Sequence, residues 1–331
     1  MANIRDVAKL SGHSISTVSR VINQRGYVAG KTAAEVRQAM KTLNYHRNDL
    51  ARALSLGKTY RVGVVLPYVN HPYFQKLADA IISAAFANNY QATFLQSNYS
   101  PEEEIKFLDM LKHHAFDGLI FTSRAIPFDK LVEYKKYGPI TCCEDTFDYP
   151  LSSAFTDRRA SFVNALQTLK DQGYTKIGMT ISRSENTSQS AKLTTEAYRE
   201  VFGEDIRDEL LFRESKTMFD GITAVAQFLN YEPDLQVAFC NGDEIAAGAK
   251  RQLKEMNRSD VLVTGQENLP ISFLMGFSSI DHRLTEMGEE AFELLFKDEI
   301  IKKPIPSRFM RRGKLRDDSD QNQDEIDRIL N

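Results

Sequence analysis

The sequence predicts an α/β protein in which a small helical head precedes a larger body of parallel sheets flanked by helices. Three observations predict this class. The first 44 residues carry the apolar spacing of three short helices. From residue 61 onward, short apolar runs alternate with segments of helical periodicity, a pattern typical of βαβ units. The alternation restarts with a helix at about residues 161–172, which favours two α/β lobes in series with a ligand-binding cleft between them.

Bulk composition agrees with a protein of more than one domain. The chain has 331 residues, of which 42% are hydrophobic, so it can bury a substantial core. Its net charge of −3 hides an asymmetry, because residues 1–58 hold ten Lys or Arg against three Asp or Glu. That balance of +7 leaves −10 for the remainder. A basic head on an acidic body confines the attraction for phosphate groups to one end.

The cysteines and the terminus bear on the compartment. Cys142, Cys143 and Cys240 lie in apolar runs and form no C-x-x-C pair, so we expect buried thiols in a reducing compartment. The N-terminus lacks an apolar signal region, and no apolar run approaches the roughly 18 residues of a membrane span. We therefore expect a soluble, cytoplasmic protein with no membrane partner.

The head begins with a helix and a turn. Asn3 precedes the first apolar residues and Asp6 follows three positions later, an arrangement typical of a helix N-terminus. Gly12 lies in the turn that follows, and Ser14 can cap a second helix. Two short helices joined in this way, with a third at about residues 31–44, predict a helix-turn-helix.

The second helix has one apolar stripe, formed by Val18, Val21 and Ile22 at positions i, i+3 and i+4. A helix of this kind packs its stripe on a small core and turns its first turn outward, as a recognition helix does in a major groove. The residues that lie off the stripe near its N-terminal end are Ile15, Ser16, Thr17 and Arg20.

Three stretches, "IRDVAKLSGHSISTVSRVIN", "GYV" and "LNYHRNDLARALSLGKT", closely resemble the LacI/GalR transcriptional regulators. The resemblance continues, more weakly, to about residue 313. It implies a DNA-binding head over residues 1–46 and a sequence-specific transcriptional regulator, most simply a repressor of carbohydrate or catabolite-related genes. It also implies a homodimer that binds double-stranded operator DNA with an inverted repeat.

The resemblance assigns roles to residues of the head. The family's base-contacting positions fall on Ile15, Ser16, Thr17 and Arg20. Arg20 could bind guanine O6 and N7 with two hydrogen bonds, and Ile15 could contact a thymine methyl group. The alternative for Arg20 is an ordinary surface charge. The residues expected to contact DNA phosphates, which set register rather than sequence, are Asn23, Thr32 and Tyr45.

Residues 47–60 connect head and body. A helix over residues 50–54 is too short to be stable alone. The resemblance implies a hinge helix that orders when two copies meet over operator DNA, with Leu54 as the wedge that enters the minor groove. Ala51 and Ser55 are the further minor-groove residues that it implies.

The body contains the alternating elements. The expected strands are 62–66, 92–96, 118–121, 140–143, 176–181, 237–240 and 261–264. The expected helices are 74–88, a segment from Pro101, 161–172, 192–202 and 219–229. The resemblance implies a periplasmic-binding-protein-like body with the lobes 61–157 plus 281–303 and 158–280 plus 304–313. Residues 314–331 are acidic and polar, and a disordered tail is expected there.

The cleft is where the resemblance places an effector, a sugar or a sugar phosphate. The residues expected to line it are Tyr73, Phe74, Glu144, Ser190, Thr194, Asp243 and Glu267. Core packing is the alternative for the two aromatic residues. Thr194 stands where the family has a ligand-clamping arginine, and loss of that guanidinium removes a strong hold on a hydroxylated or anionic ligand. Either the effector differs from the usual sugars, or the cleft binds none.

Two phrases, "YGPITCCEDT" and "TGQENLPIS", resemble the catabolite-control branch of the family from Gram-positive bacteria. This resemblance implies a phosphorylated carrier protein as a possible corepressor, although no set of docking residues can be assigned to it.

Other classes of function have weaker support. The segment Gly57-Lys58-Thr59 resembles the end of a phosphate-binding loop, but Arg52 stands where the first glycine is required. No nucleophile and base pair is found, and the histidines lack ligands at metal spacing, so we expect no catalytic residue, cofactor or metal. A transport-type sugar-binding protein without a regulatory role is the main alternative, and an α/β enzyme is the second.

Overall fold

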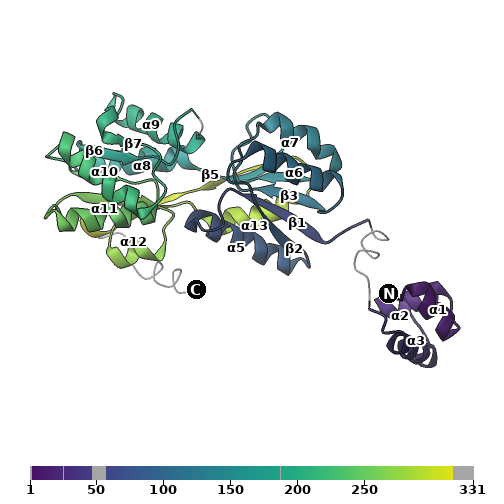
Figure 1. Cartoon of the computed structure of the whole chain (residues 1–331). Helices are drawn as coiled ribbons and strands as arrows, with labels where there is room; N and C mark the ends of the chain where they lie inside the picture. Colours follow the sequence, from purple (N-terminus) through teal and green to yellow (C-terminus); the bar gives the residue numbers. More distant parts are fainter. Residues whose placement is uncertain (1, 25, 47–56, 187, 316–331) are drawn as a thin grey trace. The chain divides into compact units, whose positions relative to one another are not determined.

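The computed structural model of the chain describes residues 2–24, 26–46, 57–186 and 188–315 (Figure 1). It forms two compact units, Met1–Thr59 and Tyr60–Asn331. We call the first the head and the second the body. No helix among the described residues is long and apolar enough to cross a membrane.

The head consists of three helices, α1 (Ile4–Ser11), α2 (Ile15–Asn23) and α3 (Gly30–Thr42). Asn3 and Asp6 cap α1 reciprocally, and the Ser14 hydroxyl accepts a hydrogen bond from the Thr17 N–H at 3.2 Å, as the sequence predicts. Gly12 ends α1 in the left-handed conformation. The buried side chains that join the helices are Val7, Ala8, Val18, Val21, Val36 and Ala39.

The body begins with the N-terminal lobe, a parallel sheet with the strand order β11-β5-β4-β3-β1-β2. Its strands are β1 (Arg61–Leu66), β2 (Gln91–Gln96), β3 (Gly118–Phe121), β4 (Ile140–Cys142), β5 (Ser152–Asp157) and β11 (Lys302–Pro306). Its helices are α5 (Pro72–Ala87), α6 (Pro101–Lys112), α7 (Phe128–Tyr134) and α13 (Leu284–Leu295). Side chains of α5 and α13 share one buried cluster with β1.

The C-terminal lobe has a second sheet with the order β12-β10-β9-β8-β6-β7, in which only the β10–β12 pair is antiparallel. Its strands are β6 (Ile177–Thr180), β7 (Leu211–Phe212), β8 (Val237–Phe239), β9 (Leu262–Gln266), β10 (Ser278–Asp281) and β12 (Arg308–Met310). Its helices are α8 (Arg158–Asp171), α9 (Gln189–Phe202), α10 (Met218–Tyr231), α11 (Asp243–Glu255) and α12 (Pro270–Met275).

Two glycines let α10 and α11 approach closely. A Cβ atom on Gly221 would lie 2.0 Å from the Ile245 carbonyl oxygen, and one on Gly248 would lie 1.9 Å from the Met218 carbonyl oxygen. Any larger residue at either position would therefore force the two helices apart.

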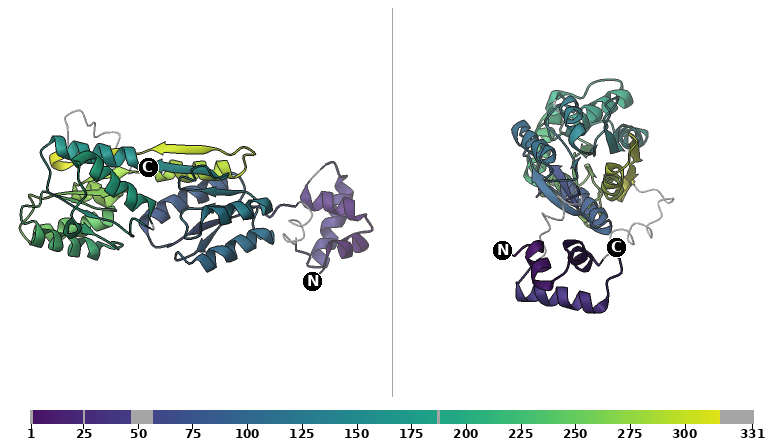
Figure 2. Two further views of the ribbon diagram at one scale, coloured as in Figure 1. Left: turned by 90° about the horizontal axis from the view of Figure 1, so that it is seen from above. Right: turned by 90° about the vertical axis from the view of Figure 1, so that its right-hand side faces the viewer.

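The chain passes between the lobes three times, after β5, between β10 and α13, and between β11 and β12 (Figures 1 and 2). The first two passages fall near residues 157 and 281, as expected. The third was expected near residue 304, but Pro304–Pro306 still pair with β5, so the passage lies at Ser307. Leu315, expected in a disordered tail, is buried in the core of the C-terminal lobe. Residues 316–331 lie outside the described part of the chain.

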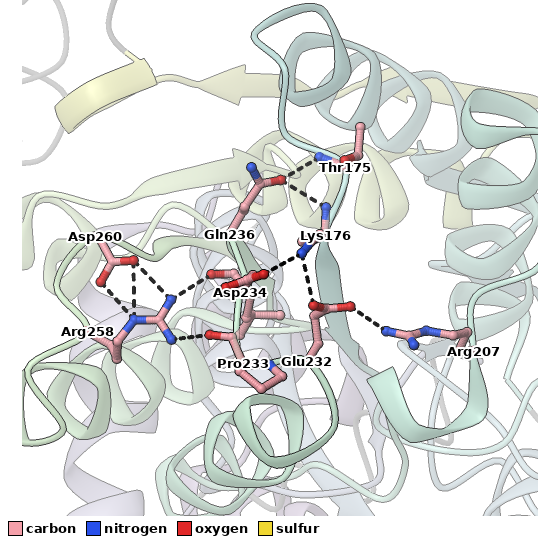
Figure 3. Close-up of polar contacts among 10 residues, drawn as sticks. Thr175, Lys176, Arg207, Glu232, Pro233, Asp234, Gln236, Arg258 and Asp260 are labelled. Atoms are coloured by element: carbon pink, nitrogen blue, oxygen red, sulfur yellow. Dashed lines mark hydrogen bonds and ion pairs between the residues drawn. The ribbon is translucent and has the colours of Figure 1, made fainter.

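The amino end of the C-terminal lobe's sheet carries a network of ion pairs (Figure 3). The Lys176 ammonium lies 3.2 Å from Glu232 and 2.9 Å from Asp234. Arg258 donates to the Pro233 carbonyl at 2.6 Å and the Leu235 carbonyl at 3.1 Å. These contacts hold the loop between α10 and β8 against the start of β6.

Candidate functional sites

One face of α2, from its first turn to Arg20, forms an outward surface on the head. Ile15 is 47% exposed, Ser16 and Arg20 are exposed, and Thr17 is half-buried. The Ser14 hydroxyl lies 2.8 Å from the Ser16 hydroxyl and 2.9 Å from that of Thr17. The two hydroxyls of the predicted reading set are therefore engaged with the helix cap, whereas Ile15 and Arg20 stand clear of it.

The predicted phosphate contacts have different surroundings. The Asn23 amide is exposed and donates to the Ser19 carbonyl at 2.9 Å. Thr32 lies in the first turn of α3, a helix that has no side-chain cap among the described contacts. Tyr45 packs half-buried against the head's core. The predicted hinge residues, Ala51, Leu54 and Ser55, lie outside the described residues.

His13, in the turn before α2, is tied to the third helix. Its Nε2 atom lies 2.7 Å from a carboxylate oxygen of Glu35 on α3. This contact gives the turn a fixed position relative to α3, which apolar packing alone does not supply at this half-exposed site.

The body holds a cavity of about 800 Å³ between its two lobes, lined by residues that follow the carboxyl ends of strands in both sheets. Its volume is in the range of small-molecule sites. Six of the seven residues predicted for the cleft line it: Tyr73, Phe74, Glu144, Ser190, Thr194 and Glu267.

Asp243 is the exception, and its prediction as a cavity residue was wrong. The first residue of α11 is fully buried behind the cavity, where it accepts hydrogen bonds from the Leu269 N–H at 2.6 Å and the Ser279 hydroxyl at 2.7 Å. Burial raises the pKa of Asp243 to about 7. Gly265 makes room for it, because a Cβ there would lie 2.1 Å from its carboxylate. Asp243 therefore holds the loop after β9.

Aromatic residues of the N-terminal lobe form one wall. The rings of Tyr73 and Phe74, in the first turn of α5, meet edge to face with centroids 5.0 Å apart. Phe74 is also part of the lobe's buried cluster, so cavity lining and core packing both apply to it. Tyr68 and Tyr99 extend the wall and meet at 5.7 Å.

Two arginines of the C-terminal lobe face this wall, and neither was among the predicted residues. Arg158, in the first turn of α8, donates to the Tyr73 hydroxyl at 2.9 Å and to the Ser190 hydroxyl at 3.2 Å. Arg183 follows β6, and its guanidinium lies 4.1 Å from the centre of the Tyr99 ring. The cavity therefore contains guanidinium groups despite the threonine at position 194.

Carboxylates complete the cavity. Glu144 pairs with Arg124 at 3.1 Å, and burial raises the pKa of Glu144 to about 7 against the opposing effect of Arg124 and Arg183. Burial also raises the pKa of Glu267 well above its usual value. Glu267 has a φ of 97°, a region that non-glycine residues rarely occupy and that occurs often at ligand sites.

The arginines could have been found from one signal. Each follows a predicted strand end or crossing, Arg158 after residue 157 and Arg183 after residue 181, where side chains of parallel strands face a ligand. Asn241, which follows β8, also lines the cavity and fits the same rule. Among the described residues, no group of three or more His, Cys, Asp or Glu is arranged to hold a metal ion.

Comparison with known proteins finds two family models. "Bacterial regulatory proteins, lacI family" matches residues 3–48, and "Periplasmic binding proteins and sugar binding domain of LacI family" matches residues 59–300. These matches confirm the resemblance and the fold class predicted from the sequence.

Curated relatives match most of the chain. Catabolite control protein B of Bacillus subtilis (strain 168), from the Gram-positive branch, is 38% identical over 313 residues, 95% of this chain and 100% of the relative. The ribose operon repressor of Halalkalibacterium halodurans is 26% identical over 92% of each chain. A crystal structure of the lac repressor dimer bound to operator and the anti-inducer ONPF has a TM-score of 0.80 at 20% identity, over 94% of this chain and 98% of that chain, which shows a common fold.

Proposed function

The chain belongs to the LacI family of bacterial transcriptional regulators, and we propose that it represses genes as a homodimer on an inverted-repeat operator. Members of this family are regulators and not enzymes, and the relatives named above are regulators and not transport proteins. The observation that carries the proposal is the exposed face of α2, with Ile15 in its first turn and Arg20 in its last turn both free of the head's core. Such a surface supports base reading in a major groove.

A second copy of the chain is the proposed partner. Val69, Ile82 and Phe94 are exposed apolar residues that line a groove beside α5 and β2, and Phe86, one helical turn after Ile82, is 81% exposed. An apolar surface of this kind favours burial against another protein surface. A repressor of the same fold is described as a dimer bound to operator, which supports the same arrangement here.

The interlobe cavity is the proposed effector site, and a sugar or a sugar phosphate is the proposed ligand class. The aromatic wall and the carboxylates supply the stacking surface and the hydrogen-bond acceptors that a polyol requires. Closure of the lobes around the ligand would change the spacing of paired hinges, which include Leu54. A cytoplasmic site of action follows from operator binding. A phosphorylated carrier protein as corepressor stays a prediction of the resemblance.

The test is operator binding by the purified full-length chain. Genomic fragments selected by the protein define the operator, and gel shifts then compare the full inverted repeat with a single half-site. We expect tighter binding to the full site, and an affinity that falls on the order of 10³-fold between 50 and 200 mM salt. Equal affinity for one and two half-sites would contradict the dimer.

Arg20→Ala is expected to relax the preference at one base pair in each half-site, with a loss of discrimination of roughly 1–3 kcal/mol. The control is Lys41→Ala, which removes an exposed cation of α3. A uniform loss of affinity across all sequences would instead make Arg20 a phosphate contact.

A further inference from the structure

We propose that the effector is an anionic sugar whose phosphate or carboxylate group binds to Arg183, with its hydroxyl groups on the carboxylates of the cavity. This assignment rests on the proposed function of the cavity as the effector site. It names the charge of the ligand and the residue that selects it.

Arg183 is held in place without an acceptor. Its guanidinium lies on the Tyr99 ring at 4.1 Å, and the Tyr99 hydroxyl is fixed by a 3.1 Å hydrogen bond with the Ser123 hydroxyl. Within the described ranges, no oxygen accepts a hydrogen bond from this guanidinium. A planar group with five N–H donors is thus oriented at the cavity wall with its donors available.

The other cations of the cavity are engaged. Arg158 donates to Tyr73 and Ser190, and the Lys216 ammonium lies 2.8 Å from the Glu214 carboxylate. A ligand would have to displace these partners, whereas Arg183 has no hydrogen-bonded partner among the described residues to give up. An oriented guanidinium with open donors is the arrangement that binds carboxylate and phosphate groups with two parallel hydrogen bonds. Arg183 is therefore the residue at which a negatively charged group of the ligand gains the most binding free energy.

The rest of the cavity fits a polyol and excludes a bare anion as the whole ligand. Glu144 and Glu267 line the same space, and their oxygens can accept hydrogen bonds from hydroxyl groups. Tyr68 and Tyr73 also line it and supply aromatic surface for a pyranose ring. A volume of about 800 Å³ is far larger than a phosphate ion requires. A sugar that carries one anionic group can bind both Arg183, through that group, and the carboxyl groups of the cavity, through its hydroxyls.

Titration calorimetry on the full-length protein tests this assignment with four probes: glucose 6-phosphate, glucuronate, glucose and inorganic phosphate. We expect one of the two charged sugars to bind, and glucose and inorganic phosphate to bind at least 10-fold more weakly. The first two probes distinguish a phosphate from a carboxylate as the anionic group. In Arg183→Gln we expect the charged sugar to lose about 10- to 100-fold in affinity.

Arg213→Gln is the matched control, because Arg213 lies outside the cavity and pairs with Glu185 and Asp208. It should keep the affinity of the unaltered chain, and thermal unfolding without ligand checks that both variants are folded. Glucose binding as well as the charged sugars, an unchanged affinity in Arg183→Gln, or binding of none of the probes would overturn the assignment. Operator gel shifts without ligand separate this failure from a failure of the proposed DNA-binding function.

Discussion

The two ends of the C-terminal lobe's sheet use charged side chains in opposite ways. At the amino end, Lys176, Arg207 and Arg258 all have acceptors on the loop between α10 and β8, as Figure 3 shows. At the carboxyl end, Arg183 lies on an aromatic ring with its N–H donors open to the cavity. Satisfied charges tie loops together, whereas an oriented and unsatisfied charge is kept for a ligand. The same residue type thus serves stability at one end and recognition at the other.

The comparison also extends to the carboxyl groups. Hydrogen bonds from Lys176 lower the pKa of Glu232 and Asp234 at the amino end, and a hydrogen bond from Arg258 lowers that of Asp260. Burial raises the pKa of Glu144 and Asp243 to about 7 at the cavity end. Paired surface charges therefore favour the ionised state, and the cavity favours the neutral one.

The largest expected effect on stability is at Asp243, which is fully buried behind the cavity. Asp243→Ala leaves the Leu269 N–H and the Ser279 hydroxyl without their acceptor, and we expect it to lower the free energy of unfolding by about 2–4 kcal/mol. Urea unfolding measures this change. Asp243→Asn keeps an oxygen acceptor and should recover most of the loss. An Ala variant as stable as the Asn variant would show that Asp243 does not hold the loop.

A smaller effect is expected at the amino end. Arg258 is 26% exposed and serves two backbone carbonyls, so Arg258→Ala should lower the free energy of unfolding by about 1–2 kcal/mol. Lys176→Ala is the control, because that side chain is 40% exposed and its ion pairs contribute less than about 1 kcal/mol. In Arg183→Gln we expect no loss by the same measurement. A loss there equal to that of Arg258→Ala would remove the contrast between the two ends.

The smallest effect is the part of the pH dependence that Glu144 contributes. Glu144 and Asp243 have folded-state pKa values of about 7, above the values near 4 of the unfolded chain, so the folded state binds more protons between these limits. Stability from these groups is present at low pH and is lost as the pH rises to about 7. Because Glu144 keeps 30% of its side chain exposed, we expect a change on the order of 1 kcal/mol from this group between pH 5 and 8.

Unfolding in urea at several pH values checks this sign, and Glu144→Gln should reduce the dependence, with Asp243 supplying the remainder. Stability that rises between pH 5 and 8 would show that the cavity does not favour the neutral carboxyl groups. The pKa values of Glu232, Asp234 and Asp260 lie below the usual range, so the stability that these carboxylates contribute is lost only at lower pH, as the pH falls through those values.

Strands with continuous apolar runs could be predicted, because a strand buried on both faces has few polar residues. Residues 62–66 and 237–240 are examples, and the structure has strands at both. β5 reads SSAFTD and β11 reads KKPIP, and neither was predicted. Apart from the exposed Asp157, their polar residues are buried or half-buried in the folded sheet, where β5 and β11 pair, a tertiary feature that no local pattern contains.

The cavity shows the same limit. Local resemblance placed Tyr73 and Phe74 where they line the cavity, because the helix that carries them follows the first strand after a short loop. It placed Asp243 wrongly, because the space that admits this side chain of α11 is made by Gly265, on strand β9. Arg158 and Arg183 were missed because these residues of the C-terminal lobe meet Tyr73 and Tyr99 of the N-terminal lobe only in the folded body. Residue spacing predicts an element's ends but not which ends meet.

The position of β11 has a consequence for synthesis on the ribosome. The N-terminal lobe is begun first, but its sheet gains this edge strand, Lys302–Pro306, only after all of residues 158–281 have been made. A few residues later, β12 is added as an antiparallel edge strand to the sheet of the C-terminal lobe. Domains commonly fold in the order of translation. Here the sheet of the N-terminal lobe, which begins first, is completed only after most of the C-terminal lobe has been made. A nascent chain released before residue 302 would therefore have neither sheet complete.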